Sequence, residues 1–300
     1  MGPLGPGISN TVTTAFVFSG GGSVGAAEVG MLQALTEAGE RPEFVVGASA
    51  GAINAVHFAA APTPDGVARL ASMWTELTRS DVFPVDRLHG AMALIGRRGS
   101  LLDPRVLRRT LEARLPVRRF EDTIIPCHIV ATALQSGEEV VLSSGSVIEA
   151  LLATSAIPVL FPPVEVGGML LTDGGVSANA PIASAIRLGA TRIIVLPTGF
   201  PCAVRALPNS LAATVLHTFA LMIARQLRAD LERIGATACV RVVPPLCPMR
   251  VAPHDFSQAA QLIRSAAEQT RLWLAGGGLE RGDIPAALHP HFHGNSASEG

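Results

Sequence analysis

Residues 43–61, EFVVGASAGAINAVHFAAA, decide how this chain begins to fold. The run 43–46 is apolar and rich in β-branched and aromatic residues, which predicts a short buried strand. Residues 50–61 are rich in alanine, which predicts a helix, and Pro62 and Pro64 end it. The segment therefore predicts a strand followed by a sharp turn and a helix.

The turn carries the pattern G-x-S-x-G, with Gly47, Ser49 and Gly51. A serine on such a turn has a strained backbone, so its neighbours two residues away must lack side chains. Its hydroxyl projects at a helix N-terminus, where developing negative charge is favoured. The pattern predicts Ser49 as a nucleophile, and a glycine-serine turn without catalytic function is the alternative.

An earlier unit of the same kind lies at residues 14–39. The apolar run 14–19 predicts a strand, Gly20-Gly21-Gly22 follows it, and a helix beginning near Gly25 extends to Gly39. Three glycines let successive backbone N–H groups turn toward one point beside a helix N-terminus. We therefore expect Gly20, Gly21 and Gly22 to form an oxyanion hole, with the Ala50 N–H as an additional donor.

The glycines also fit a second motif, because Gly20, Gly22 and Gly25 satisfy G-x-G-x-x-G, the loop of dinucleotide-binding folds. Such a site needs an acidic residue about 20 positions downstream at the end of the next strand. Here that strand leads directly into the Ser49 turn, so the sequence favours the oxyanion loop and no cofactor.

A carboxylate is the best candidate for the catalytic base. Residues 170–172 form the end of an apolar strand, followed by Asp173-Gly174-Gly175. An aspartate before two glycines is typical of a turn, and that is the alternative interpretation. At a strand end, Asp173 can also reach the serine hydroxyl, accept its proton during attack and return it to the leaving alcohol.

Histidine is the usual base in α/β-hydrolases, and the chain order does not exclude it, because five histidines follow Asp173. Only one strand-helix unit precedes Ser49, however, whereas that fold places several strands before its nucleophile. His217 lies in an apolar helix, His254 in a loop between prolines and the others in a segment expected to fray. The five are His217, His254, His289, His291 and His293.

The rest of the chain alternates between strands and helices, with a two-residue hairpin signal at Gly167-Gly168. This alternation predicts a three-layer α/β/α fold around a mainly parallel sheet. We expect a flexible N-terminus at 1–13, one domain at 14–275 and a flexible tail at 276–300. The further expected helices are 65–78, 103–115, 147–153, 182–188, 211–234 and 256–274, and the further strands 127–134, 140–143, 164–166, 169–172, 192–196 and 239–243.

Residues 79–100 form an irregular piece with Phe83, Leu94 and several arginines but no clean period. A packed surface loop is one interpretation, and a mobile lid or bilayer-touching loop is the other. Elsewhere, the longest apolar stretch, 147–161, is interrupted by polar residues and a proline, so it does not predict a membrane span.

Composition narrows the class of partner. The formal net charge is −1 and the estimated pI 6.7, so no overall field attracts nucleic acid or anionic lipid. The start of the chain has no secretory signal pattern. The four cysteines, at positions 127, 202, 239 and 247, lack metal-ligand spacing and suggest reduced thiols without a metal site. We expect a cytoplasmic protein with peripheral membrane contact at most.

Together these motifs resemble the patatin-like phospholipases: the Gly20 to Gly25 loop, Gly47-x-Ser49-x-Gly51 and Asp173-Gly174-Gly175 occur in that order and spacing. The similarity extends through 155–163 and Asn179-Ala180-Pro181 to residue 275. It implies a Ser-Asp dyad without histidine, with no metal or cofactor, that hydrolyses phospholipid, lysophospholipid or neutral acyl esters through an acyl-enzyme.

One position departs from the family. The family usually has Arg or Lys before the last glycine of the loop, where this chain has Val24, which weakens the case for a phospholipid preference. A catalytically weak lipid- or acyl-chain-binding protein on the same fold is therefore the alternative function. The sequence leaves acyl-chain length, headgroup and oligomeric state open.

Overall fold

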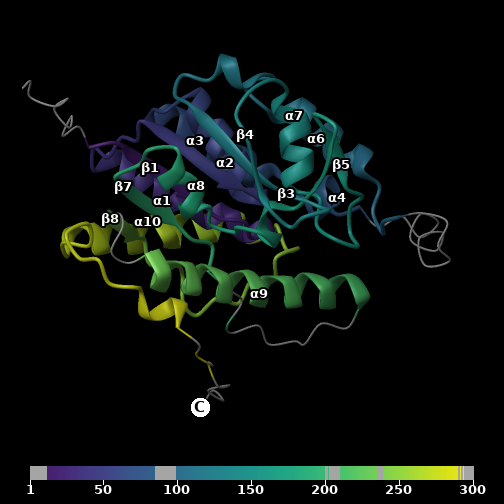
Figure 1. The fold of residues 1–300 in the computed structure, drawn as a ribbon. Helices are drawn as coiled ribbons and strands as arrows, with labels where there is room; N and C mark the ends of the chain where they lie inside the picture. Colours follow the sequence, from purple (N-terminus) through teal and green to yellow (C-terminus); the bar gives the residue numbers. More distant parts are fainter. Residues whose placement is uncertain are drawn as a thin grey trace, which may run out of the picture.

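A mixed sheet of eight strands forms the centre of the protein, in the order β5-β6-β3-β2-β1-β7-β8, with β4 also paired to β3 (Figure 1). The computed structural model describes residues 12–84, 99–199, 202, 210–234, 239–289, 291 and 293. The strands are β1 (Thr14–Phe18), β2 (Phe44–Ala48), β3 (Cys127–Ala133), β4 (Glu139–Leu142), β5 (Val164–Val166), β6 (Met169–Thr172), β7 (Arg192–Leu196) and β8 (Cys239–Val242).

Five strands, from β3 through β2, β1 and β7 to β8, run parallel, whereas β4, β5 and β6 add an antiparallel edge. The central strand β1 is completely buried and sends alternate side chains to opposite faces. Phe16 and Phe18 enter one hydrophobic cluster, and Ala15 and Val17 enter the other. A parallel strand buried on both faces needs helices on both sides of the sheet.

Helices cover both faces and complete a three-layer α/β/α fold. One face is covered by α1 (Ala26–Glu37), α2 (Ser49–Ala60), α3 (Pro64–Glu76), α6 (Pro104–Arg114), α7 (Val147–Thr154) and α10 (Ala259–Ala275). The other face is covered by α8 (Ile182–Arg187) and by α9 (Leu211–Ile234), which lies below the sheet in Figure 1. Leu227 and Leu231 are the side chains of α9 buried in that layer.

The predicted strand-helix order is confirmed, and the predicted helix starts agree with the structure to within one residue, except that of the last helix. A 3₁₀ turn, η1 (Gly22–Gly25), precedes α1, so the regular helix begins at Ala26. The last helix begins at Ala259, because the Asp255 carboxylate accepts the Ser257 backbone N–H at 3.0 Å and forms a turn.

The segment after α10 differs from the predicted flexible tail. It packs against the sheet as far as the short turn η4 (Ala286–Leu288), and Leu288 is buried beside Ile284. The Arg241 guanidinium on β8 also donates to the Glu280 carbonyl at 3.3 Å. Burial of a few apolar side chains therefore extends the packed chain beyond 275.

The irregular piece at 79–100 lies partly outside the described residues, since 85–98 are not described. Its first part forms the short helix α4 (Arg79–Val82), and Phe83 is buried between Phe161 and Phe256, each with ring centroids 6.1 Å away. Phe83 is thus a core residue, which favours the packed loop over a bilayer contact for this part.

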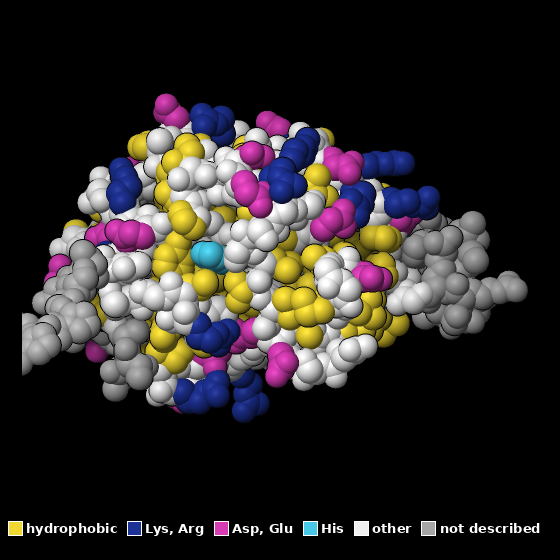
Figure 2. Space-filling model, turned by 45° about the horizontal axis from the view of Figure 1, so that its top comes forward, with side chains coloured by type: hydrophobic (Ala, Val, Ile, Leu, Met, Phe, Trp, Pro, Cys, Tyr) yellow, Lys and Arg dark blue, Asp and Glu magenta, His cyan; other side chains and the backbone are white. Residues whose placement is uncertain are grey.

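The surface carries no large field of one sign on the face shown in Figure 2, where acidic and basic side chains alternate around areas of hydrophobic side chains. Among the described helices, none has the length and apolarity needed to cross a membrane.

Candidate active site

Ser49 is the first residue of α2, directly after β2, with a φ of 49° in the left-handed region. Its two motif glycines are required by close packing. A Cβ on Gly51 would lie 2.5 Å from the Ser19 carbonyl oxygen, and one on Gly47 would lie 2.7 Å from the Ala52 Cα. The strained turn therefore fits between β1 and α2 only with glycine on both sides.

Asp173 follows β6 and lies against Ser49 although 124 residues separate them. The Ser49 hydroxyl donates to Asp173 Oδ2 at 2.9 Å, and the Gly175 N–H donates to Oδ1 at 2.7 Å. The backbone of Asp173 is held as well, since its N–H donates to the Ala156 carbonyl and its carbonyl accepts the Thr132 hydroxyl. Both carboxylate oxygens are therefore fixed.

The environment of Asp173 changes its acidity. Its side chain is fully buried, and this burial raises the pKa of Asp173 to about 7, while the hydrogen bonds from Gly175 and Ser49 partly oppose the rise. A carboxylate with a pKa near neutrality is suited to accept a proton and return it.

Thr154, at the end of α7, supports the turn and was not singled out by the sequence. Its Oγ1 accepts the Ser49 backbone N–H at 2.9 Å, and its own hydroxyl donates to the Val130 carbonyl on β3. Thr154 therefore ties the Ser49 turn to the neighbouring strand. A threonine at the end of an apolar helix carries no local signal for this role.

The glycine loop curves beside Ser49, and its three N–H groups differ in their partners. The Gly20 N–H donates to the Asn179 carbonyl at 3.1 Å, so the expected role of Gly20 as an oxyanion donor does not fit this geometry. The N–H groups of Gly21 and Gly22 have no acceptor among the described residues. All three glycines line one pocket with Ser49 and Asp173.

Two other segments hold the loop. The Thr198 hydroxyl, after β7, donates to the Gly20 carbonyl at 2.7 Å. The Ser23 N–H donates to the Pro253 carbonyl at 2.8 Å, and its hydroxyl donates to the Ala252 carbonyl at 3.1 Å. Gly22 has a φ of 60°, and a Cβ there would lie 2.4 Å from the Pro253 carbonyl oxygen.

A buried polar network lies beneath the loop and was also missed by the sequence analysis. The Glu28 carboxylate accepts the Ser19 N–H at 2.6 Å and the Asn54 side-chain amide at 2.8 Å, and Asn54 Oδ1 accepts the Trp74 indole N–H at 2.7 Å. Burial raises the pKa of Glu28 well above its usual range. The network joins α1, α2 and α3 under the site, and Val24 is buried in the hydrophobic cluster beside them.

An apolar crevice opens beside Ser49. Its walls come from α2, α3, the α4 region and the segment after α7, and none of the described residues that line it is charged. The lining side chains include Ile53, Trp74, Leu77, Phe83, Leu107, Ile157, Phe161 and Phe256. A second apolar hollow, between α9 and Ile157, is bordered by the exposed side chains of Val159, Val176 and Met222.

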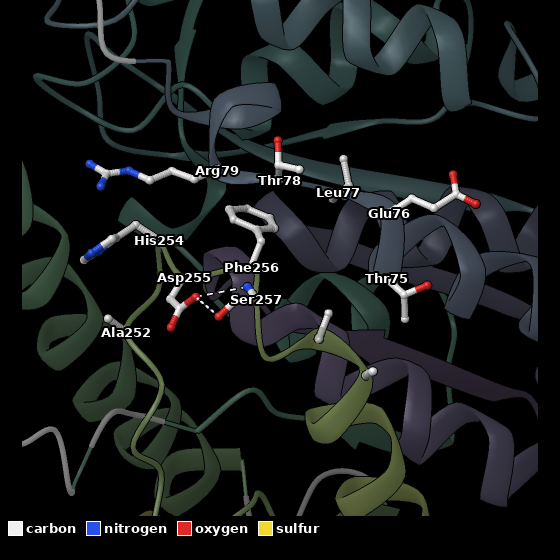
Figure 3. A pocket seen from close by; sticks show the side chains of 12 residues that line it. Thr75, Glu76, Leu77, Thr78, Arg79, Ala252, His254, Asp255, Phe256 and Ser257 are labelled. Atoms are coloured by element: carbon white, nitrogen blue, oxygen red, sulfur yellow. Dashed lines mark hydrogen bonds between the residues drawn. The ribbon is translucent and has the colours of Figure 1, made fainter.

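The hollow of about 600 Å³ in Figure 3 shares Leu77 and Phe256 with the lining of the crevice. His254 and Arg79 point to one side of it, and Asp255 is hydrogen-bonded to Ser257. This serine-carboxylate contact spans two residues of one turn and Ser257 is exposed, whereas Ser49 and Asp173 are both buried. None of the described residues that line the crevice and the loop-side pocket is a histidine, and the carboxylate hydrogen-bonded to Ser49 is that of Asp173.

The fold and the site define the class of α/β proteins with a serine at a nucleophile elbow and a buried carboxylate beside it. Residues 16–186 match the family model described as patatin-like phospholipase, and the chain belongs to this family. The matched range includes the glycine loop, the Ser49 turn and Asp173, so the dinucleotide-binding interpretation of the loop is not supported.

Relatives with partial coverage agree with this assignment. An uncharacterized NTE family protein of Mycobacterium tuberculosis is 34% identical over 176 residues, which are 58% of this chain and 46% of that protein. The human patatin-like phospholipase domain-containing protein 6 is 27% identical over 189 residues, covering 62% of this chain and 13% of that protein. The chain thus matches less than half the length of these relatives.

Solved structures with a similar arrangement include VipD from Legionella pneumophila, with a TM-score of 0.46, 16% identity and coverage of 88% of this chain and 67% of that one. The human GIVD cytosolic phospholipase A2 in complex with the inhibitor methyl gamma-linolenyl fluorophosphonate and terbium chloride has a TM-score of 0.46 and 13% identity, covering 92% of this chain and 59% of that one.

Proposed function

We propose that this protein is a lipid acyl hydrolase that uses a Ser49-Asp173 dyad. The 2.9 Å hydrogen bond from the Ser49 hydroxyl to the buried Asp173 carboxylate is the observation that carries the proposal. Ser49 Oγ attacks the acyl carbonyl while Asp173 takes its proton, and the proton then passes to the leaving alcohol. Water, deprotonated by Asp173, hydrolyses the acyl-enzyme and restores Ser49.

The negatively charged oxygen of the tetrahedral intermediate needs backbone N–H donors that have no other hydrogen-bond acceptor. The N–H groups of Gly21 and Gly22 meet this condition, and the Ala50 N–H at the start of α2 is a third candidate. The N-terminus of α2 adds positive potential at the same point. Fixed donors of this kind each contribute about 100 to 1,000-fold to turnover in serine hydrolases.

The substrate is proposed to be an acyl ester whose chain enters the crevice between Trp74 and Phe161. Among the described residues, the side chains that line this crevice and the loop-side pocket include no arginine, and Asp173 is the one ionisable group. An anionic headgroup therefore finds no ion-pair partner among these residues. This favours neutral acyl esters over lipids with an anionic headgroup.

The experiment compares wild type with Ser49→Ala, Asp173→Asn and, as a matched control, Ser136→Ala, an exposed serine in the β3–β4 turn. Hydrolysis of p-nitrophenyl esters, monoacylglycerol and phosphatidylcholine is measured with fluorophosphonate labelling. We expect both dyad variants to lose at least about 1,000-fold in turnover and Ser49→Ala to lose the label. If the wild type neither hydrolyses nor labels, a lipid-binding protein becomes the better proposal.

Contact with a lipid surface is proposed for the exposed apolar rim formed by Val159, Val176 and Met222. Apolar side chains at the mouth of a lipid site can enter the outer layer of a membrane or micelle. Liposome flotation of Val159→Ser/Met222→Ser beside wild type tests this. Equal flotation of both would remove the rim from the proposal.

A further inference from the structure

Four side chains with metal-ligand chemistry meet at the surface, away from Ser49. They are Cys202, after β7, Cys247, after β8, and His291 and His293 near the end of the described chain. Their ligand atoms all lie within 4.8 Å of one another. Two cysteine sulfurs and two imidazole nitrogens are the ligand set typical of structural zinc sites.

The distances fit one ion at the centre. The two sulfur atoms are 4.0 Å apart, and the Cys247 sulfur is 3.1 Å from Nε2 of both His291 and His293. Zinc bonds of about 2.3 Å to sulfur and about 2.0 Å to nitrogen, at tetrahedral angles, place two sulfurs about 3.8 Å apart and sulfur and nitrogen about 3.5 Å apart. The three separations from the Cys247 sulfur differ from these values by about 0.2 to 0.4 Å, and the other pairs lie within 4.8 Å.

Outer contacts orient two of the ligands as in known zinc sites. His291 Nδ1 lies 2.7 Å from the His289 carbonyl oxygen, which favours a proton on Nδ1 and leaves Nε2 with its lone pair toward the cluster. The Met249 backbone N–H donates to the Cys202 sulfur at 3.3 Å, and Met249 itself is buried. Neither contact involves the dyad.

We propose that Cys202, Cys247, His291 and His293 bind one structural Zn²⁺. Binding displaces the two thiol protons, and the thiolates and neutral imidazoles complete a closed tetrahedral shell. The ion joins three segments that are distant in sequence. Two of these segments also hold the glycine loop. Thr198, which precedes Cys202, is hydrogen-bonded to Gly20. Ala252 and Pro253, which follow Cys247, accept hydrogen bonds from Ser23.

The test uses the full chain purified with a tag free of histidine, under reducing conditions. We expect about one zinc per chain by elemental mass spectrometry. After chelation, Co²⁺ should titrate to one equivalent and give the visible bands of tetrahedral cobalt with a thiolate charge-transfer band. Removal of zinc should lower the Tm by about 10 °C.

Matched variants show whether these side chains hold the ion. Cys247→Ser and His293→Ala should each weaken Co²⁺ affinity by more than about 100-fold. Loss of a group that only contacts a ligand typically weakens affinity by about 10 to 100-fold, and loss of a ligand itself should cost more. The controls are Cys239→Ser, an exposed thiol elsewhere, and His289→Gln, which keeps the backbone carbonyl. Both should bind as wild type does. Circular dichroism establishes that each variant is folded.

Three results would overturn the proposal. One is a wild-type protein that carries no metal and gives no cobalt spectrum. Another is equal loss of metal in Cys239→Ser or His289→Gln. The third is a Cys202–Cys247 disulfide in metal-free protein kept under argon, detected as the loss of two hydrogens in the intact mass. None of these measurements depends on ester hydrolysis, so the zinc site and the proposed hydrolase function are tested independently.

Discussion

Gly20 and Asn179 form a reciprocal pair between the glycine loop and the segment that follows Asp173. The Gly20 N–H donates to the Asn179 carbonyl at 3.1 Å, and the Asn179 side-chain amide donates to the Gly20 carbonyl at 3.3 Å. Asn179 is buried and lines the pocket that contains Ser49. The pair therefore ties the glycine loop to the segment that follows Asp173.

Replacing Asn179 with Ala removes the side-chain half of this pair. We expect kcat for p-nitrophenyl esters to fall about tenfold with KM nearly unchanged, because the loop donors lose their fixed position in the transition state. Steady-state kinetics and the rate of fluorophosphonate labelling measure the effect. Gln261→Ala, on the exposed face of α10, is the control, and an unchanged kcat in folded Asn179→Ala would contradict the prediction.

The rate of Ser49 acylation should depend on the ionisation of Asp173. With a pKa of about 7, Asp173 is a carboxylate at pH 8, whereas only about 1% of it is ionised at pH 5. The labelling rate should therefore fall about 100-fold between these pH values, with its midpoint near 7. The expected profile of Asp173→Asn is low and flat, and a wild-type rate that is constant from pH 5 to 8 would exclude Asp173 as the base.

The same buried carboxyl should reduce the free energy of unfolding as the pH rises. Its pKa in the folded state, about 7, exceeds the unfolded value of about 3.9, so the native state binds more protons between these values. The contribution of Asp173 to stability is therefore fully present below about pH 4 and is lost as the pH rises to 7, by up to about 4 kcal/mol.

Asp173→Asn tests this directly, since an amide can accept the Gly175 N–H and donate to the Ser49 oxygen. Urea unfolding should show the variant more stable than wild type at pH 8 and nearly equal at pH 4. A variant that is less stable at pH 8 would mean that the ionised carboxyl stabilises the fold.

The crevice beside Ser49 should limit acyl-chain length. Ile53→Trp fills it from α2, so kcat/KM for p-nitrophenyl palmitate should fall by about tenfold or more, while that for the acetate stays within about twofold. Leu272→Trp, at a position that is 70% exposed on α10, is the matched control. Equal losses on both esters would indicate a general packing defect and place the acyl chain elsewhere.

The sequence by itself determined the order of strands and helices, the Gly167-Gly168 hairpin and the Ser49 turn. These depend on the period of apolar side chains and on glycines that particular turns require, which are local properties of the chain. It also supplied Asp173 as a candidate, because a strand end followed by two glycines is a local pattern as well.

Only the tertiary structure decided which groups meet. In the fold, the Ser49 hydroxyl lies 2.9 Å from the Asp173 carboxylate, and the Gly20 N–H donates to the Asn179 carbonyl. Phe83 is buried in the core. The tertiary structure also gathered Cys202, Cys247, His291 and His293, whose spacing along the chain shows no metal motif. Contacts between residues far apart in sequence follow from sheet order and loop packing, and no local pattern encodes them.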